Sequence, residues 1–207
     1  TILAIQDIPT AAHGPPGSLP GDCSFRREKN PLTPEGGRGF SLRNLTAMKK
    51  KSIKRTAQQF REKSEAVLAF AQECSAELGE KHTSWAYDYA VIALYREFEA
   101  LMKETLAGAV NNDLSTVSTE LGITLPKHLR FDVCEYLITA GRYFDFRGRD
   151  GLIKLIKQYV PETHYLVLIV KKKRYQQPIN RLVALRNFAA HSSRQAKDAA
   201  LKAVEDR

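Results

Sequence analysis

Apolar residues recur every three or four positions along most of the chain after residue 50. The repeat runs from 50 to about 78 and returns from 85 to about 110. This spacing is the period of an amphipathic α-helix. Gly79 and the polar residues that follow it interrupt the repeat, and Ser84 can cap the second helix. We therefore predict two long antiparallel helices.

Shorter elements follow this predicted hairpin. The segment 164–170 is apolar and β-branched, and it resembles a strand, but no second strand accompanies it. An all-α fold, an antiparallel bundle of four to five helices, is therefore favoured over a sheet. The further helices are predicted at 114–121 as a helical turn, then at 127–143, 151–159, 179–192 and 194–204.

The first 47 residues differ from the rest in composition. They are rich in proline and glycine and have no sustained apolar period. Such a stretch cannot hold a helix and buries little, so we expect a disordered leader over 1–47 and a helical domain over 48–207. Met48 with the lysines after it is typical of a translation start, so the leader is either upstream sequence or a native disordered tail.

Charge and cysteine content narrow the function classes. The 207 residues include 32 Lys and Arg against 23 Asp and Glu, a formal net charge of +9, which favours polyanionic partners such as RNA, DNA or an anionic membrane. Cys23, Cys74 and Cys134 have no metal-ligand spacing, and we interpret them as reduced thiols. No apolar run is long enough to cross a bilayer. We expect a cytoplasmic protein with no membrane partner, no cofactor and no metal site.

Three polar residues near the C-terminus lie on or beside one face of the predicted helix over 179–192. Asn187 and His191 are four positions apart and share that face, and the long side chain of Arg186 can bring a guanidinium toward the same point. A proton-transfer group, an amide and a phosphate-binding cation can therefore converge. The alternative is that Asn187 and His191 are surface residues near a helix end, where a cation complements the dipole.

The sequence Arg-Asn-Phe-Ala-Ala-His at 186–191 resembles the signature of the HEPN superfamily, which is an arginine, a polar residue, three further positions and a histidine. With 16 Arg and 5 His in the chain, roughly 0.4 Arg–His pairs at this spacing arise by chance, and requiring Asn after Arg lowers this to about 0.01. The resemblance extends from about Trp85 onward, includes Phe98 and Glu99, and is nearest the RiboL-PSP branch.

The resemblance implies a metal-independent endoribonuclease in which the ribose 2′-hydroxyl is the nucleophile. His191 would transfer protons, Arg186 would bind phosphate oxygens, and Asn187 would orient either group. It also implies a homodimer, which supplies a second histidine, and a toxin–antitoxin, stress or antiviral defence setting with an antitoxin protein as a further partner. Ser193 replaces the tyrosine that a neighbouring nucleotidyltransferase modifies in one branch, so we do not expect that regulation.

Other residues are weaker candidates. Glu99 is an auxiliary candidate for the site, although a solvated helix edge is the more common place for such a glutamate. A basic run could bind the RNA backbone, although such runs are usually just solvated. Its members are Lys171, Lys172, Lys173 and Arg174.

The rival function is a noncatalytic helical module that binds RNA, nucleotide or a protein partner, and a helical scaffold without RNA affinity is a third possibility.

Overall fold

The computed structural model describes residues 52–205, and the predicted leader over 1–47 lies outside them. The described residues form eight α-helices and one short 3-10 helix, with no strand among them, which confirms the all-α prediction. The helices are α1 (Ile53–Glu77), α2 (Glu80–Asn112), α3 (Ser115–Leu121), α4 (Phe131–Thr139), α5 (Gly148–Lys157), α6 (Tyr165–Val170), α7 (Gln176–His191) and α8 (Arg194–Glu205), and the 3-10 helix η2 covers Lys173–Tyr175.

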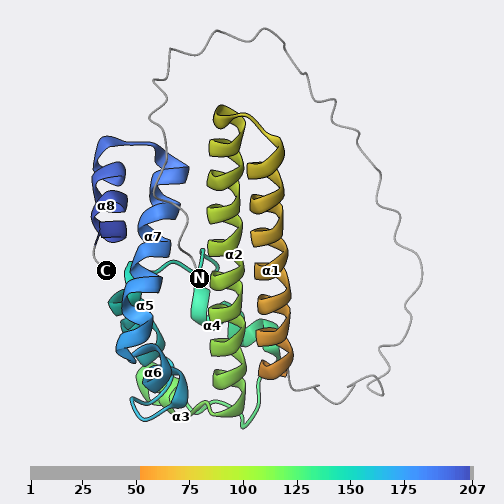
Figure 1. The fold of residues 1–207 in the computed structure, drawn as a ribbon. Helices are drawn as coiled ribbons and strands as arrows, with labels where there is room; N and C mark the ends of the chain where they lie inside the picture. Colours follow the sequence, from red (N-terminus) through yellow and green to blue (C-terminus); the bar gives the residue numbers. More distant parts are fainter. Residues whose placement is uncertain (1–51, 206–207) are drawn as a thin grey trace, which may run out of the picture. The chain divides into compact units, whose positions relative to one another are not determined.

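Helices α1 and α2 form the predicted long hairpin (Figure 1). Ser52 caps α1 by accepting a hydrogen bond from the Arg55 backbone N–H. The second helix begins at Glu80, five residues before the predicted start, and Ser84 lies inside it, so the predicted cap is wrong. Gly79 takes the cap position, and Glu80 places a carboxylate in the first turn, where the helix dipole favours a negative charge.

The strand-like segment is a helix. Residues 165–170 form α6, and the His164 ring accepts a hydrogen bond from the Leu166 backbone N–H at its N-terminus. Leu166, Val167 and Val170 are buried, and these positions share one helical face. Packing of that face against the core and the histidine cap outweigh the β propensity of the sequence.

Other predicted bounds also change, and the helix predicted over 151–159 is α5, which covers Gly148–Lys157. Of the helix predicted over 127–143, only residues 131–139 are helical, as α4. This helix ends there because Ala140 and Gly141 both adopt positive φ angles. The last long helix begins at Gln176, three residues before the predicted start, and Pro178 falls in its first turn, where its missing N–H costs no hydrogen bond. Ser192 then takes the left-handed conformation and ends α7, so His191 is the last residue of that helix.

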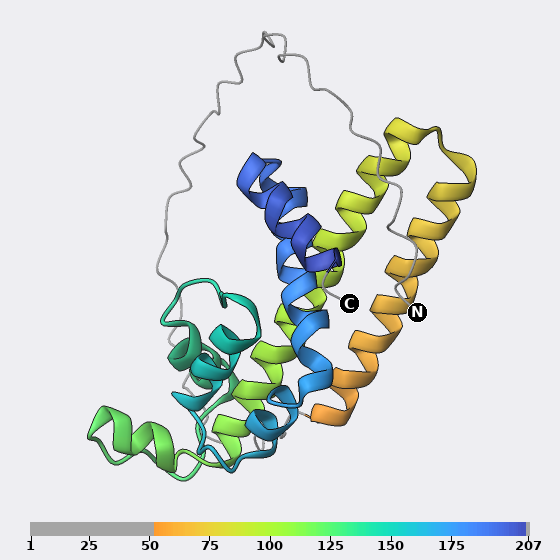
Figure 2. The ribbon, with the colours of Figure 1, turned by 60° about the vertical axis from the view of Figure 1, so that its left-hand side comes forward.

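The core lies around the C-terminal half of α2. Side chains from α2, α4, α5 and α6 are fully buried there, and Tyr95, Leu106, Leu152 and Val167 are among the largest of them. Helices α1 and α7 flank α2, and α8 folds back along α7 (Figure 2). This arrangement places the helix with the Arg-Asn-x-x-x-His sequence against α2 on one side and α8 on another.

Candidate functional site

The side chain of Arg186 points from α7 toward α2. Its guanidinium carbon lies 4.2 Å from the centroid of the Tyr95 ring. Its Nη1 donates a hydrogen bond of 2.9 Å to Oδ1 of Asn187, and its Nη2 lies 3.9 Å from Oδ1 of Asp145, in the loop before α5. About a quarter of the side chain, 24%, is exposed. The guanidinium is therefore held in place and remains partly accessible to solvent.

Tyr95 forms the base of this arrangement. Its residue exposure is 2%, and its ring stacks on that of Phe146 with the centroids 5.8 Å apart. Burial raises the pKa of Tyr95, and the Arg186 guanidinium beside it acts in the opposite direction. The hydroxyl is buried and makes no hydrogen bond of standard geometry within residues 52–205. Tyr95 therefore offers Arg186 an aromatic face, an interaction worth about 0.5–2 kcal/mol.

Glu99 lies one helical turn from Tyr95 and faces the same cluster. Burial raises the pKa of its carboxyl group, and the nearby Arg186 guanidinium lowers it. The residue is half-buried. Glu99 therefore does not lie on a fully solvated edge of the helix. In addition to Asp145, it places a second carboxylate close to Arg186.

His191 stands apart from these contacts. It is exposed at the end of α7, and within residues 52–205 its ring makes no hydrogen bond or ion pair that meets standard geometry. Five positions separate it from Arg186, which is about 7.5 Å along a helix axis. The fold thus brings Arg186 together with Asn187, while the imidazole remains open to solvent on the same helix.

The predicted basic run does not act as one uniform patch. The Lys171 ammonium lies 3.5 Å from the Glu162 carboxylate, and the Arg174 guanidinium stacks over the Tyr175 ring at 4.7 Å. Lys172 is exposed, and Lys173 lines a hollow between α7 and α8. Lys173 and Lys172 are therefore the members of the run best placed to meet a ligand.

Sequence reasoning missed two members of the Arg186 cluster, Tyr95 and Asp145. Both are distant from Arg186 along the chain and carry no motif. The available signal for Tyr95 was its position four residues before Glu99, which puts both side chains on one face of α2. Asp145 lies in a loop, where no periodicity exists to place it.

Within residues 52–205, no three His, Cys, Asp or Glu side chains are grouped so that they could hold a metal ion. In the same part of the chain, no helix combines the length and the apolar character needed to cross a membrane. Comparison with protein-family models, curated proteins and solved structures finds no match in any of the three. The resemblance of residues 186–191 to the HEPN signature therefore rests on the motif itself.

Proposed function

We propose that this protein is a metal-independent endoribonuclease of the HEPN type, which cleaves RNA by attack of a ribose 2′-hydroxyl on the adjacent phosphate. The observation that carries the proposal is the placement of Arg186, Asn187 and His191 on one helix. The guanidinium is fixed against Tyr95 with an exposed part, and the imidazole is free at the helix end. By resemblance, the setting is toxin–antitoxin, stress or antiviral defence in the cytoplasm, with an antitoxin as a further partner.

Proton transfer is the role of His191. An imidazole side chain can both take up and release a proton under mild conditions, which suits it to general acid–base catalysis. It removes the proton from the 2′-hydroxyl, the 2′-oxygen forms a bond to phosphorus, and the bond from phosphorus to the 5′-oxygen breaks. The leaving 5′-oxygen takes up a proton. The products are a 2′,3′-cyclic phosphate and a 5′-hydroxyl, and such general acid–base catalysis contributes about 10²–10⁴-fold.

Charge stabilisation is the role of Arg186. Negative charge builds on the non-bridging phosphate oxygens as the 2′-oxygen attacks, and a guanidinium can donate two parallel hydrogen bonds to them. The contacts with Tyr95 and Asn187 hold the guanidinium before substrate arrives, which reduces the entropy lost on binding. Asn187 is therefore an orienting residue for Arg186.

The second proton-transfer group comes from a second copy of the chain. The motif at 186–191 contains one histidine, and one imidazole cannot serve as base and acid in the same step. A two-fold dimer through the exposed end of α7 would bring His191 of a second copy to the leaving oxygen. Ala190, His191 and Ser192 are all exposed, and the small side chains of Ala190 and Ser192 allow two such helix ends to approach closely.

The test is incubation of purified protein with total RNA in the presence of EDTA. Wild-type protein should cleave RNA and leave 2′,3′-cyclic phosphate ends, and His191→Ala should abolish cleavage. His82→Ala is the matched control, because His82 is also an exposed helical histidine but lies in the first turn of α2, outside the motif. Cleavage by the His191 variant at the wild-type rate, or its loss in EDTA, would reject the proposal.

A noncatalytic module that binds RNA, nucleotide or protein is the second candidate. The observation that favours it is that the contacts of Arg186 with Tyr95, Asn187 and Asp145 are all internal, as expected of an arginine with a structural role. This candidate predicts RNA binding that weakens with salt and no cleavage. The same incubation therefore separates the two functions.

A further inference from the structure

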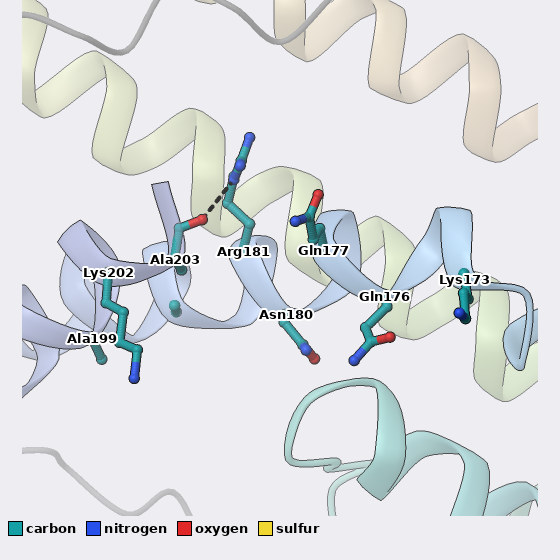
Figure 3. A pocket seen from close by; sticks show the side chains of 9 residues that line it. Lys173, Gln176, Gln177, Asn180, Arg181, Ala199, Lys202 and Ala203 are labelled. Atoms are coloured by element: carbon teal, nitrogen blue, oxygen red, sulfur yellow. Dashed lines mark hydrogen bonds between the residues drawn. The ribbon is translucent and has the colours of Figure 1, made fainter. Parts of the chain in front are cut away.

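A polar hollow of about 720 Å³ lies between the first half of α7 and the second half of α8 (Figure 3). One side is formed by η2 and α7, and the other by α8. The lining residues are Lys173, Gln176, Gln177, Asn180, Arg181, Ala184, Ala199, Lys202 and Ala203. The Arg181 Nε donates a hydrogen bond of 3.0 Å to the Ala203 carbonyl and ties the two helices together at this point.

The charges of the side chains that line the hollow favour an anionic ligand. Among the described residues, the lining of the hollow includes three cationic side chains and no carboxylate. The Lys173 and Lys202 ammonium groups make no ion pair with a carboxylate within residues 52–205, so their charges are not neutralised there. A ligand with several negative charges would meet cations from both helices.

Amide groups complete the donor set. The Asn180 Oδ1 accepts a hydrogen bond of 2.8 Å from the Arg149 backbone N–H at the start of α5. Because the oxygen is occupied in this way, the amide nitrogen is the group that Asn180 can offer to a ligand. Gln176 adds a second amide from the first turn of α7, where the helix dipole also favours a negative charge.

The face of α7 that lines the hollow at Asn180 and Ala184 leads along the helix toward the motif. Asn180, Ala184, Asn187 and His191 are separated by three or four residues, so they form one stripe along α7. Ala184 belongs to the lining of the hollow, and Asn187 follows it one turn later. Asn180 and His191 are about 16 Å apart along the helix axis. Stacked nucleic acid advances 3.4 Å per nucleotide, so a strand of about five nucleotides spans this distance.

We infer that the hollow between α7 and α8 is a second binding site for the RNA strand. This site holds backbone phosphates about five nucleotides away from the bond that is cut at His191. Lys173 and Lys202 bind the phosphates from opposite sides, and the Asn180 amide donates to a phosphate oxygen between them. The inference rests on the proposed ribonuclease function and adds that the enzyme acts on single-stranded RNA extending beyond the cleaved bond.

The experiment compares two double variants that remove the same charge. Lys173→Ala with Lys202→Ala empties the hollow of its two lysines. Lys54→Ala with Lys127→Ala is the control, since both residues are exposed and lie outside the hollow. Binding is measured by fluorescence anisotropy with a 2′-O-methyl RNA of about 12 nucleotides, within the usual range of single-strand site sizes, which cannot be cut because its 2′-oxygens are blocked. Circular dichroism establishes that each variant is folded.

The hollow variant should bind the RNA roughly tenfold more weakly than wild type at moderate salt, and the slope of log K against log salt should become shallower by about 1.4, or 0.7 for each phosphate contact. The control pair should lose markedly less. Equal effects of the two pairs overturn the inference. If wild type binds through the hollow but does not cut natural RNA, the ribonuclease proposal fails and the site stands. If wild type cuts RNA and the two pairs of variants bind RNA alike, the ribonuclease proposal stands and the proposed site in the hollow fails.

Discussion

The guanidinium carbon of Arg186 lies 4.2 Å from the centroid of the Tyr95 ring, and this contact joins the motif helix α7 to the buried helix α2. Tyr95 itself is fixed by stacking on Phe146 in the core. The position of the guanidinium is thus determined by an aromatic ring that cannot move without disturbing the core. Arg186 is the part of the motif that the fold orients most firmly.

This contact predicts different outcomes for two substitutions of Tyr95. Tyr95→Phe keeps the ring and removes a buried hydroxyl without a standard hydrogen bond, so stability should be unchanged or slightly higher. Tyr95→Leu removes the aromatic face and leaves a smaller side chain in the core, so it should lower the free energy of unfolding by about 1–3 kcal/mol. Urea denaturation followed by circular dichroism measures both effects.

The rate of RNA cleavage should depend on the aromatic ring of Tyr95 and not on its hydroxyl group. Tyr95→Phe should retain the wild-type rate, whereas folded Tyr95→Leu protein should cut more slowly because Arg186 is no longer held. Equal rates for the two folded variants would show that the ring does not position Arg186.

Replacement of Arg186 by lysine tests the need for a guanidinium. An ammonium cannot donate two parallel hydrogen bonds to a phosphate, nor can it stack flat on the Tyr95 ring. We expect Arg186→Lys to reduce kcat/KM for RNA cleavage about 100-fold, the cost typical of one lost transition-state donor. Arg194→Lys, an exposed position at the start of α8, is the control and should retain activity. Comparable activity of both variants would assign Arg186 a structural role.

Every described α-helix except α6 was expected from the sequence, although the bounds of several differ from the predicted ones. Helices α1, α2, α7 and α8 lie where their period indicated, within a few residues at each end. The six residues of α6 are too few to display a helical period, so their β-branched composition suggested a strand. Burial of Leu166 and Val167 decided the outcome, and burial depends on the rest of the fold.

Only the part of the candidate site that lies within helix α7 was predictable from the sequence. The spacing of Asn187 and His191 follows from α7 alone, and the local contact of Arg186 with Asn187 lies within that helix. The contacts with Tyr95 and Asp145 join segments far apart in the chain, and only the packing of α7 against α2 creates them. The hollow is a similar case, because Lys173 and Lys202 line the same hollow only through the return of α8 along α7.

A dimer through the end of α7 predicts that a charge at Ala190 separates the copies. Ala190 is exposed beside His191, and two-fold symmetry would place the same substitution on both sides of the contact. Ala190→Arg should therefore give a monomer at micromolar concentration in sedimentation experiments and lose RNA cleavage, while wild type sediments as a dimer. Ala76→Arg, at an exposed position of α1, should remain dimeric. A wild-type monomer with full activity would contradict the shared site.

Glu99→Gln should make the protein more stable, and the gain should grow with pH. In the unfolded chain this carboxyl titrates near its ordinary value of 4.5, whereas burial raises its pKa in the folded protein. Between the two pKa values the folded state holds more protons than the unfolded state, so the free energy of unfolding of wild type falls as the pH rises. Above the folded pKa the penalty for burying the charge is complete and constant.

Glutamine carries no proton to lose, so its stability does not follow this fall. Urea denaturation across a pH series should therefore show the two proteins diverging from about pH 4.5 upward, with the variant more stable, and then running parallel. Glu77→Gln, near the exposed end of α1, should follow the wild-type curve. The opposite sign, with wild type gaining on the Glu99 variant as pH rises, would mean that attraction to Arg186 exceeds the cost of burial. Glu99 would then be an ion-pair partner that holds the guanidinium, and its removal should also slow RNA cleavage.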